Sequence, residues 1–212
     1  MDRCVSRRGL DAAEEPRQRA LANLTRAIQP TRRFPANVFT ADWRECYFFD
    51  SDRMFIGAFA GNVRTLLELE GGVCACMCDV YGTERGDPPE RRCLFIDPQG
   101  DNELYLSYLR QPRGPDVIEW SYGLNNLACT SDVGRWAIYC EGQSEMAVIA
   151  FHERGIAKTF APALARLEAY PIREAIEREI SHVFSLKHML PTFREMLVKE
   201  YGTGKRDDSE LP

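Results

Sequence analysis

The sequence predicts an α+β fold, in which a mainly antiparallel sheet is flanked by N-terminal and C-terminal helices. Two segments in the first third of the chain have apolar residues at helical spacing. Short apolar runs separated by turn-forming residues follow between positions 73 and 153, which is typical of strands. After Gly155 the helical spacing returns. Strands grouped between helices favour one sheet with helices packed on it over alternating βαβ units.

The length of 212 residues fits one large domain. A hydrophobic fraction of 44% and a charged fraction of 28% are those of a chain that buries a core. We expect a flexible N-terminus over residues 1–12, a single α+β domain over 13–201, and a disordered polar tail over 202–212.

A first helix is predicted over residues 14–30. Pro16 suits its first turn and Pro30 ends it. Its single apolar stripe suggests a helix that lies on a larger body. The stripe consists of Leu21, Leu24 and Ile28.

A second helix is predicted over residues 52–70, with Gly71 just past its end. Gly57 and Gly61 disfavour a helix by roughly 1 kcal/mol each, so a strand over 53–59 is the alternative. The apolar positions are Ile56, Phe59, Ala60, Val63, Leu66 and Leu67.

Strands are predicted over residues 73–81, 92–97 and 116–123. The segment 103–111 fits either a strand or a helix. Turns rich in Pro, Gly and Asp separate these segments.

Residues 134–153 predict a β-hairpin, because two apolar runs are joined by a short turn containing Gly142 and Gln143. This turn pairs Cys140 with Glu145. Both faces of the hairpin are apolar, so we expect the C-terminal helices, or else a partner, to cover the second face. The faces carry Trp136, Ile138, Cys140, Ala147 and Ile149 on one side, and Ala137, Tyr139, Met146 and Val148 on the other.

The C-terminal part predicts helical structure over residues 159–184, interrupted at Pro171, and a last helix over 190–201 with Pro191 in its first turn. Two of the three histidines, His182 and His188, fall in this region.

Three cysteines at alternate positions are the strongest candidate for chemistry: Cys74, Cys76 and Cys78. On a strand they share one face, with neighbours roughly 6.5 to 7 Å apart. Zinc with bonds of ~2.3 Å needs sulfurs ~3.8 Å apart. We therefore expect no metal site and interpret the thiols as packing in a buried strand, with a reactive thiol as the alternative.

A Cys–His dyad is the second candidate, formed by Cys140 and His152 of the hairpin. The expected pairing places His152 near Val133, which puts the two side chains on the order of 20 Å apart. Proton transfer requires ~3 Å. The sequence therefore predicts no catalytic set, and it contains no cofactor motif, so we expect no cofactor.

The net charge of −5 argues against general nucleic-acid binding and permits a basic protein partner. The N-terminal residues show no signal peptide, and no run of ~18 to 20 apolar residues predicts a membrane span. We therefore expect a cytoplasmic protein whose eight cysteines stay reduced.

The segment GRWAIYCEGQSEMAVIAF, followed by amphipathic helices, resembles the sheet-plus-helix pattern of small bacterial toxin-immunity proteins over residues 130–185. The resemblance implies an acidic cytosolic protein that blocks the active site of a toxin from the same locus. It does not imply individual contact residues.

We expect a non-catalytic protein-binding module, and the oligomeric state stays open. The alternatives are an enzyme with a cysteine or carboxylate mechanism and a regulatory or scaffold oligomer. Carboxylates and aromatics at strand ends and in the hairpin are the expected binding residues. They are Asp79, Tyr81, Tyr139, Glu141 and Glu145.

Overall fold

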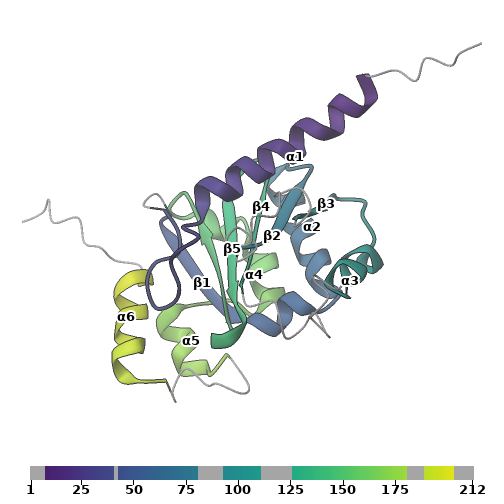
Figure 1. The fold of residues 1–212 in the computed structure, drawn as a ribbon. Coiled ribbons are helices and arrows are strands. Elements are labelled where there is room, and N and C mark those ends of the chain that lie inside the picture. The colour runs from purple at the N-terminus through teal and green to yellow at the C-terminus, as the bar shows by residue number, and fades with distance from the viewer. Residues whose placement is uncertain (1–7, 41–42, 81–92, 111–125, 181–188, 203–212) are drawn as a thin grey trace, which may run out of the picture.

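A seven-stranded antiparallel sheet forms the centre of the computed structural model, which describes residues 8–40, 43–80, 93–110, 126–180 and 189–202 (Figure 1). The strand order is β3-β2-β4-β5-β6-β1-β7. The predicted α+β class is confirmed, and the strand predicted over 116–123 lies outside the described residues. The strands are β1 (Glu45–Asp50), β2 (Ala75–Asp79), β3 (Cys93–Ile96), β4 (Asn126–Ser131), β5 (Trp136–Glu141), β6 (Met146–Phe151) and β7 (Tyr170–Pro171).

Helices cover both faces of the sheet. In Figure 1, α1 runs past β2 and β4, while α5 and α6 lie together beside β1. These three helices close one apolar core, and α2, α3 and α4 close the other. The helices are α1 (Arg8–Ala27), α2 (Ala58–Glu70), α3 (Asn102–Arg110), α4 (Ala161–Leu167), α5 (Ile172–Arg178) and α6 (Pro191–Tyr201).

The predicted hairpin is β5 and β6, and its division into two apolar faces is confirmed. The predicted register is wrong by two residues, because Cys140 pairs with Ala147 and not with Glu145. The turn takes four residues: a 3-10 turn over Gly142–Ser144, followed by Glu145 with a φ of 52°. A shift of two positions preserves the face of every side chain, since the period of a strand is two.

Three strands of the sheet were not predicted: β1, β4 and the two-residue β7, which lies within the segment predicted to be helical. β1 is a short segment with acidic residues at both ends, and it enters the sheet between β6 and β7. β4 is buried along its whole length but carries Asn126, Thr130 and Ser131. Polar residues at buried positions hide the alternation by which a strand is recognised.

The helices differ from the predictions at their N-terminal ends. α1 begins at Arg8, inside the segment expected to be flexible, and Pro16 lies in the helix interior and not in its first turn. The helix predicted over 52–70 is split into a 3-10 turn, η1 (Ser51–Phe55), and α2, with Gly57 at the junction. The described part of the ambiguous segment 103–111, up to Arg110, is helical and belongs to α3. The predicted break at Pro171 separates α4 from α5, and Pro191 does begin α6.

Candidate functional site

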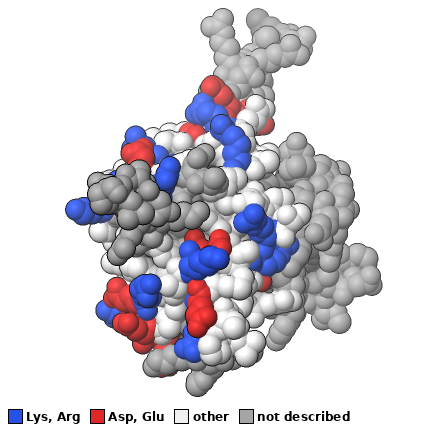
Figure 2. All heavy atoms as spheres, turned by 90° about the vertical axis from the view of Figure 1, so that its left-hand side faces the viewer, with Lys and Arg blue, Asp and Glu red and all other residues white. Residues whose placement is uncertain are grey.

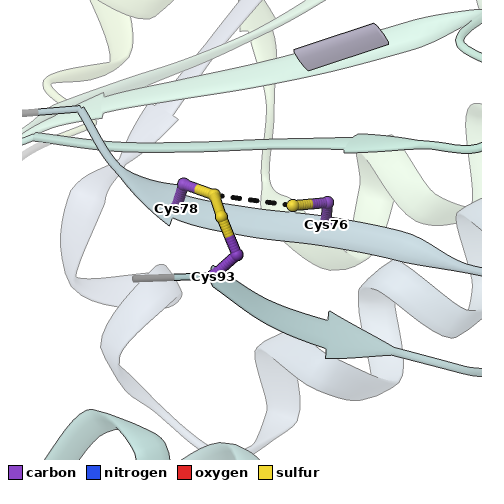
Figure 3. A group of neighbouring side chains, drawn as sticks. All are labelled: Cys76, Cys78 and Cys93. Atoms are coloured by element: carbon purple, nitrogen blue, oxygen red, sulfur yellow. Dashed lines mark hydrogen bonds between the residues drawn. A yellow bond between two sulfur atoms is a disulfide. The ribbon is translucent and has the colours of Figure 1, made fainter. Parts of the chain in front are cut away.

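Three cysteine sulfurs meet on the α1 side of the sheet, near its β3 edge (Figure 3). Cys76 and Cys78 project from the same face of β2, and Cys93 begins β3 directly opposite Cys78. Cys78 and Cys93 form a disulfide, and the Cys76 sulfur lies 3.5 Å from that of Cys78. All three sulfurs lie within 4.8 Å of one another. We call this group the cysteine cluster.

The cluster corrects two sequence-based expectations. The sulfurs of Cys76 and Cys78 are not too far apart to share a zinc ion, because the spacing along a strand describes backbone positions and the side chains turn toward each other. The thiols are not all reduced either, since one pair is oxidised. Cys74 precedes β2 and is not in the cluster; its sulfur contacts the carbonyl oxygen of Ala75 at 3.7 Å.

Cys93 was missed because it lies in a different predicted strand. Its signal was present in the sequence, since antiparallel pairing of residues 73–81 with 92–97 brings cysteines of the two strands face to face. The register that places Cys93 opposite Cys78 could not be derived from the two segments alone.

An apolar pocket lies between α1 and strands β2, β3 and β4, and two members of the cluster, Cys78 and Cys93, form part of its floor. Its volume is about 150 Å³. Residues of α1 form one wall and the sheet forms the other. The lining residues are Leu21, Leu24, Thr25, Ile28, Pro30, Cys78, Asp79, Val80, Cys93 and Ala128.

Burial keeps the free thiols of the sheet protonated. Desolvation raises the pKa of Cys76 to about 12 and that of Cys46 to about 12. It also raises the pKa of Cys129 and Cys140 far above the ordinary value. A thiol is nucleophilic only as the thiolate, so these residues are poor nucleophiles at neutral pH.

Labelling of the folded protein at pH 8 is therefore expected to be slow at Cys46 and Cys76. With a pKa of about 12, each thiol should react on the order of 10³-fold more slowly than a free cysteine of pKa about 8.5. Timed maleimide labelling and peptide mass spectrometry measure this, with the urea-unfolded chain as the fast reference. Rapid labelling of Cys76 in the folded chain would restore the hypothesis of a thiol enzyme.

The dyad of Cys140 and His152 does not form. His152 follows β6, and its ring packs against that of Trp43 at a tilt, with centroids 4.2 Å apart. Trp43 belongs to the core on the α1 side, whereas Cys140 belongs to the core on the α2 side. His152 pairs with Arg135 instead of the predicted Val133, but the conclusion that the two residues are far apart holds.

Two carboxylates, which the sequence did not single out, organise one end of the sheet: Asp132 is buried and Glu70 is half-buried. Asp132 accepts hydrogen bonds from the backbone N–H groups of Val73 and Cys74 at 3.0 and 3.1 Å, and its other oxygen lies 3.3 Å from the guanidinium of Arg19. These bonds tie the segment before β2 and helix α1 to the end of β4.

Glu70, at the end of α2, accepts a hydrogen bond of 2.7 Å from the indole N–H of Trp136. Burial raises the pKa of Glu70 to about 7, although the bonds from Ser131, Trp136 and the backbone of Arg135 lower it. Asp132 adds to the increase through its charge. Glu70 therefore changes charge near neutral pH.

Three of the predicted binding residues, Asp79, Glu141 and Glu145, lie at the opposite end of the sheet, and all three are half-buried. Glu141 accepts a hydrogen bond of 3.0 Å from the backbone N–H of Phe34, and Asp79 lines the apolar pocket.

The other two predicted binding residues do not belong to this group. Tyr139 is fully buried in the core on the α1 side, so its side chain is not available to a partner. Tyr81 lies outside the described residues.

Comparison of the chain with protein-family models, with curated proteins and with solved structures finds no significant match. Among the residues that the structure describes, no helix combines the length and apolar character needed to cross a bilayer.

Proposed function

We propose that this chain is a non-catalytic cytosolic module that binds a partner protein, as an immunity-type inhibitor that neutralises a cognate bacterial toxin. The observation that carries the proposal is the apolar pocket between α1 and the sheet. The partner inserts one aliphatic or aromatic side chain into this pocket.

The size and lining of the pocket suit such an anchor. A volume of about 150 Å³ equals that of a cavity known to accept benzene. Leu21 and Leu24 of α1 form an aliphatic wall with Ile28, which follows the helix, and Val80 and Ala128 lie on the sheet side. Anchors of this kind, seated in preformed pockets, contribute most of the free energy of binding at protein interfaces.

The charges nearby favour a basic partner. Asp79 lies in the pocket lining, and Glu141 lies two strands away at the same end of the sheet. The whole chain has a net charge of −5. A carboxylate at the pocket and a negative net charge speed the encounter with a basic partner and disfavour acidic ones. On the face shown in Figure 2, basic and acidic side chains are interspersed, so that face offers no comparable preference.

The thiol environment counts against the alternative of a cysteine enzyme. Cys76 is fully buried and its pKa is about 12, which leaves little thiolate at neutral pH. A binding role needs no ionised cysteine, and the apolar side chains of the pocket serve it directly.

Replacing Thr25 with arginine tests the pocket. Thr25 is exposed at the pocket wall, so Thr25→Arg places a long charged side chain at the entrance without disturbing the core. The partner is first captured from the native host and purified. Its affinity for the variant should fall about 30-fold, because a blocked hot-spot pocket costs about 2 kcal/mol. Isothermal titration calorimetry measures the change.

The matched control is Ala22→Arg, since Ala22 is also exposed on α1 but does not line the pocket. This variant should bind within about twofold of the wild type. Equal binding by Thr25→Arg and the wild type would refute the pocket as the contact. If the chain binds the partner but leaves the activity of the partner unchanged, the inhibitor role is refuted and the binding role is not.

A further inference from the structure

We propose that the cysteine cluster, once its disulfide is reduced, binds one thiophilic metal ion of the zinc class. The ligands are the sulfurs of Cys76, Cys78 and Cys93. This proposal does not depend on the partner protein, because it concerns an ion beneath the pocket and not the occupant of the pocket.

The donor set fits such an ion. Thiolate ligands select soft ions such as Zn²⁺, Cu⁺ and Cd²⁺ over hard ones. Zinc with Zn–S bonds of ~2.3 Å requires sulfurs ~3.8 Å apart. The Cys76 and Cys78 sulfurs are 3.5 Å apart, close to the required spacing. The Cys78 and Cys93 sulfurs are bonded in the oxidised chain and must separate to ~3.8 Å after reduction, by rotation of two side chains that lie directly opposite each other on β2 and β3.

Reduction is the step that frees two of the ligands. A dithiol reductant supplies two electrons and two protons, the bond between Cys78 and Cys93 becomes two thiols, and the reductant becomes a disulfide. Binding of the ion then displaces the thiol protons to solvent. The oxidised chain retains only the Cys76 thiol in the cluster, and one thiol does not hold the ion.

The surroundings protect the ion and give it a route in. Cys76 is fully buried, Cys78 is 8% exposed and Cys93 is half-buried, so two of the three sulfurs are largely shielded from bulk water. Cys78 and Cys93 line the apolar pocket, which connects the cluster to the surface and admits a fourth ligand such as water. Ordinary core packing accounts for the burial, but it does not require three sulfurs from two strands to converge on one point.

Zinc binding to the full-length chain tests the proposal. The wild type is reduced with dithiothreitol under anaerobic conditions, freed of reductant, and dialysed against Zn²⁺ in competition with a chromogenic chelator. One ion per reduced chain is expected, and none for the oxidised chain. With Co²⁺ as a second probe, the reduced chain should show the ultraviolet charge-transfer absorption of sulfur ligands.

Two variants locate the site. Cys76→Ser should weaken zinc binding by at least about 10- to 100-fold, since even residues that only support metal ligands have effects of that size. Cys74→Ser is the matched control: Cys74 is buried in the same run of sequence but stays outside the cluster, so binding should be unchanged. Circular dichroism checks folding, and if Cys76→Ser does not fold, Cys93→Ser replaces it.

The proposal fails if the reduced wild type binds no Zn²⁺, or if the oxidised chain binds it equally well. It also fails if Cys74→Ser weakens binding as much as the cluster variants do. Charge-transfer absorption that survives in the cluster variants would place the ion elsewhere and would overturn it too.

Discussion

Replacing Asp132 with alanine is expected to lower the free energy of unfolding by about 2 to 4 kcal/mol. The carboxylate of Asp132 is the acceptor for the backbone N–H groups of Val73 and Cys74. Loss of the acceptor leaves the buried Cys74 N–H without a partner, which costs about 1 to 3 kcal/mol on its own. The ion pair with Arg19 adds little, because the Arg19 side chain is 47% exposed. Urea unfolding followed by circular dichroism measures the loss.

Two further variants separate the causes. Asp132→Asn retains an acceptor oxygen and loses the charge, so its effect should be smaller than that of alanine. Asp52→Ala removes an exposed carboxylate and should change stability by no more than about 0.5 kcal/mol. Equal effects of Asp132→Ala and Asp52→Ala would contradict the structural role given to Asp132.

Replacing Glu70 with glutamine is expected to stabilise the protein, relative to the wild type, more at alkaline than at acidic pH. Burial is the main cause that raises the pKa of Glu70 from 4.5 to about 7 in the folded state. A carboxyl group with a raised folded-state pKa stabilises the fold below its unfolded pKa, and this contribution is lost as the pH rises through about 7. Glutamine is neutral at every pH, so the variant does not lose this stabilising contribution as the pH rises.

The size of this stability difference follows from the shift in the pKa of Glu70. The difference in unfolding free energy between Glu70→Gln and the wild type should move in favour of the variant by about 3 kcal/mol between pH 4 and pH 8.5. Taking this difference cancels the titration of the other groups. Trp136→Phe removes the indole donor to Glu70 and should steepen the pH dependence. A difference that does not change with pH would show that Glu70 keeps its charge in the fold.

The sequence was sufficient for features that depend on periodicity. Alternation assigned the faces of β5 and β6, because a side chain on a strand can point only to one side or the other. The same alternation could not fix the register, which depends on Glu145 taking a φ of 52° in the turn. Nothing in a run of Gly, Gln, Ser and Glu demands that conformation.

The candidate sites depend on contacts between distant segments, and these were not predictable. The cluster needed the side-chain orientations of Cys76 and Cys78 and the pairing partner Cys93. Glu70, which ends α2, and Asp132, which directly follows β4, lie at the same end of the sheet. In a chain with 32 acidic residues, only the fold shows that Asp132 is buried and that Glu70 is half-buried.

The two outer strands of the described sheet limit aggregation. β3 has four residues, and β7 has two, one of which is Pro171 and has no N–H to donate. On the β3 side, the guanidinium of Arg17 also lies over the Phe95 ring, 5.4 Å from its centroid. Short strands, proline and an overlying charge are means by which sheets avoid pairing edge to edge. A sheet with two apolar faces, sealed by helices, is thus also a poor template for strand addition by a misfolded copy.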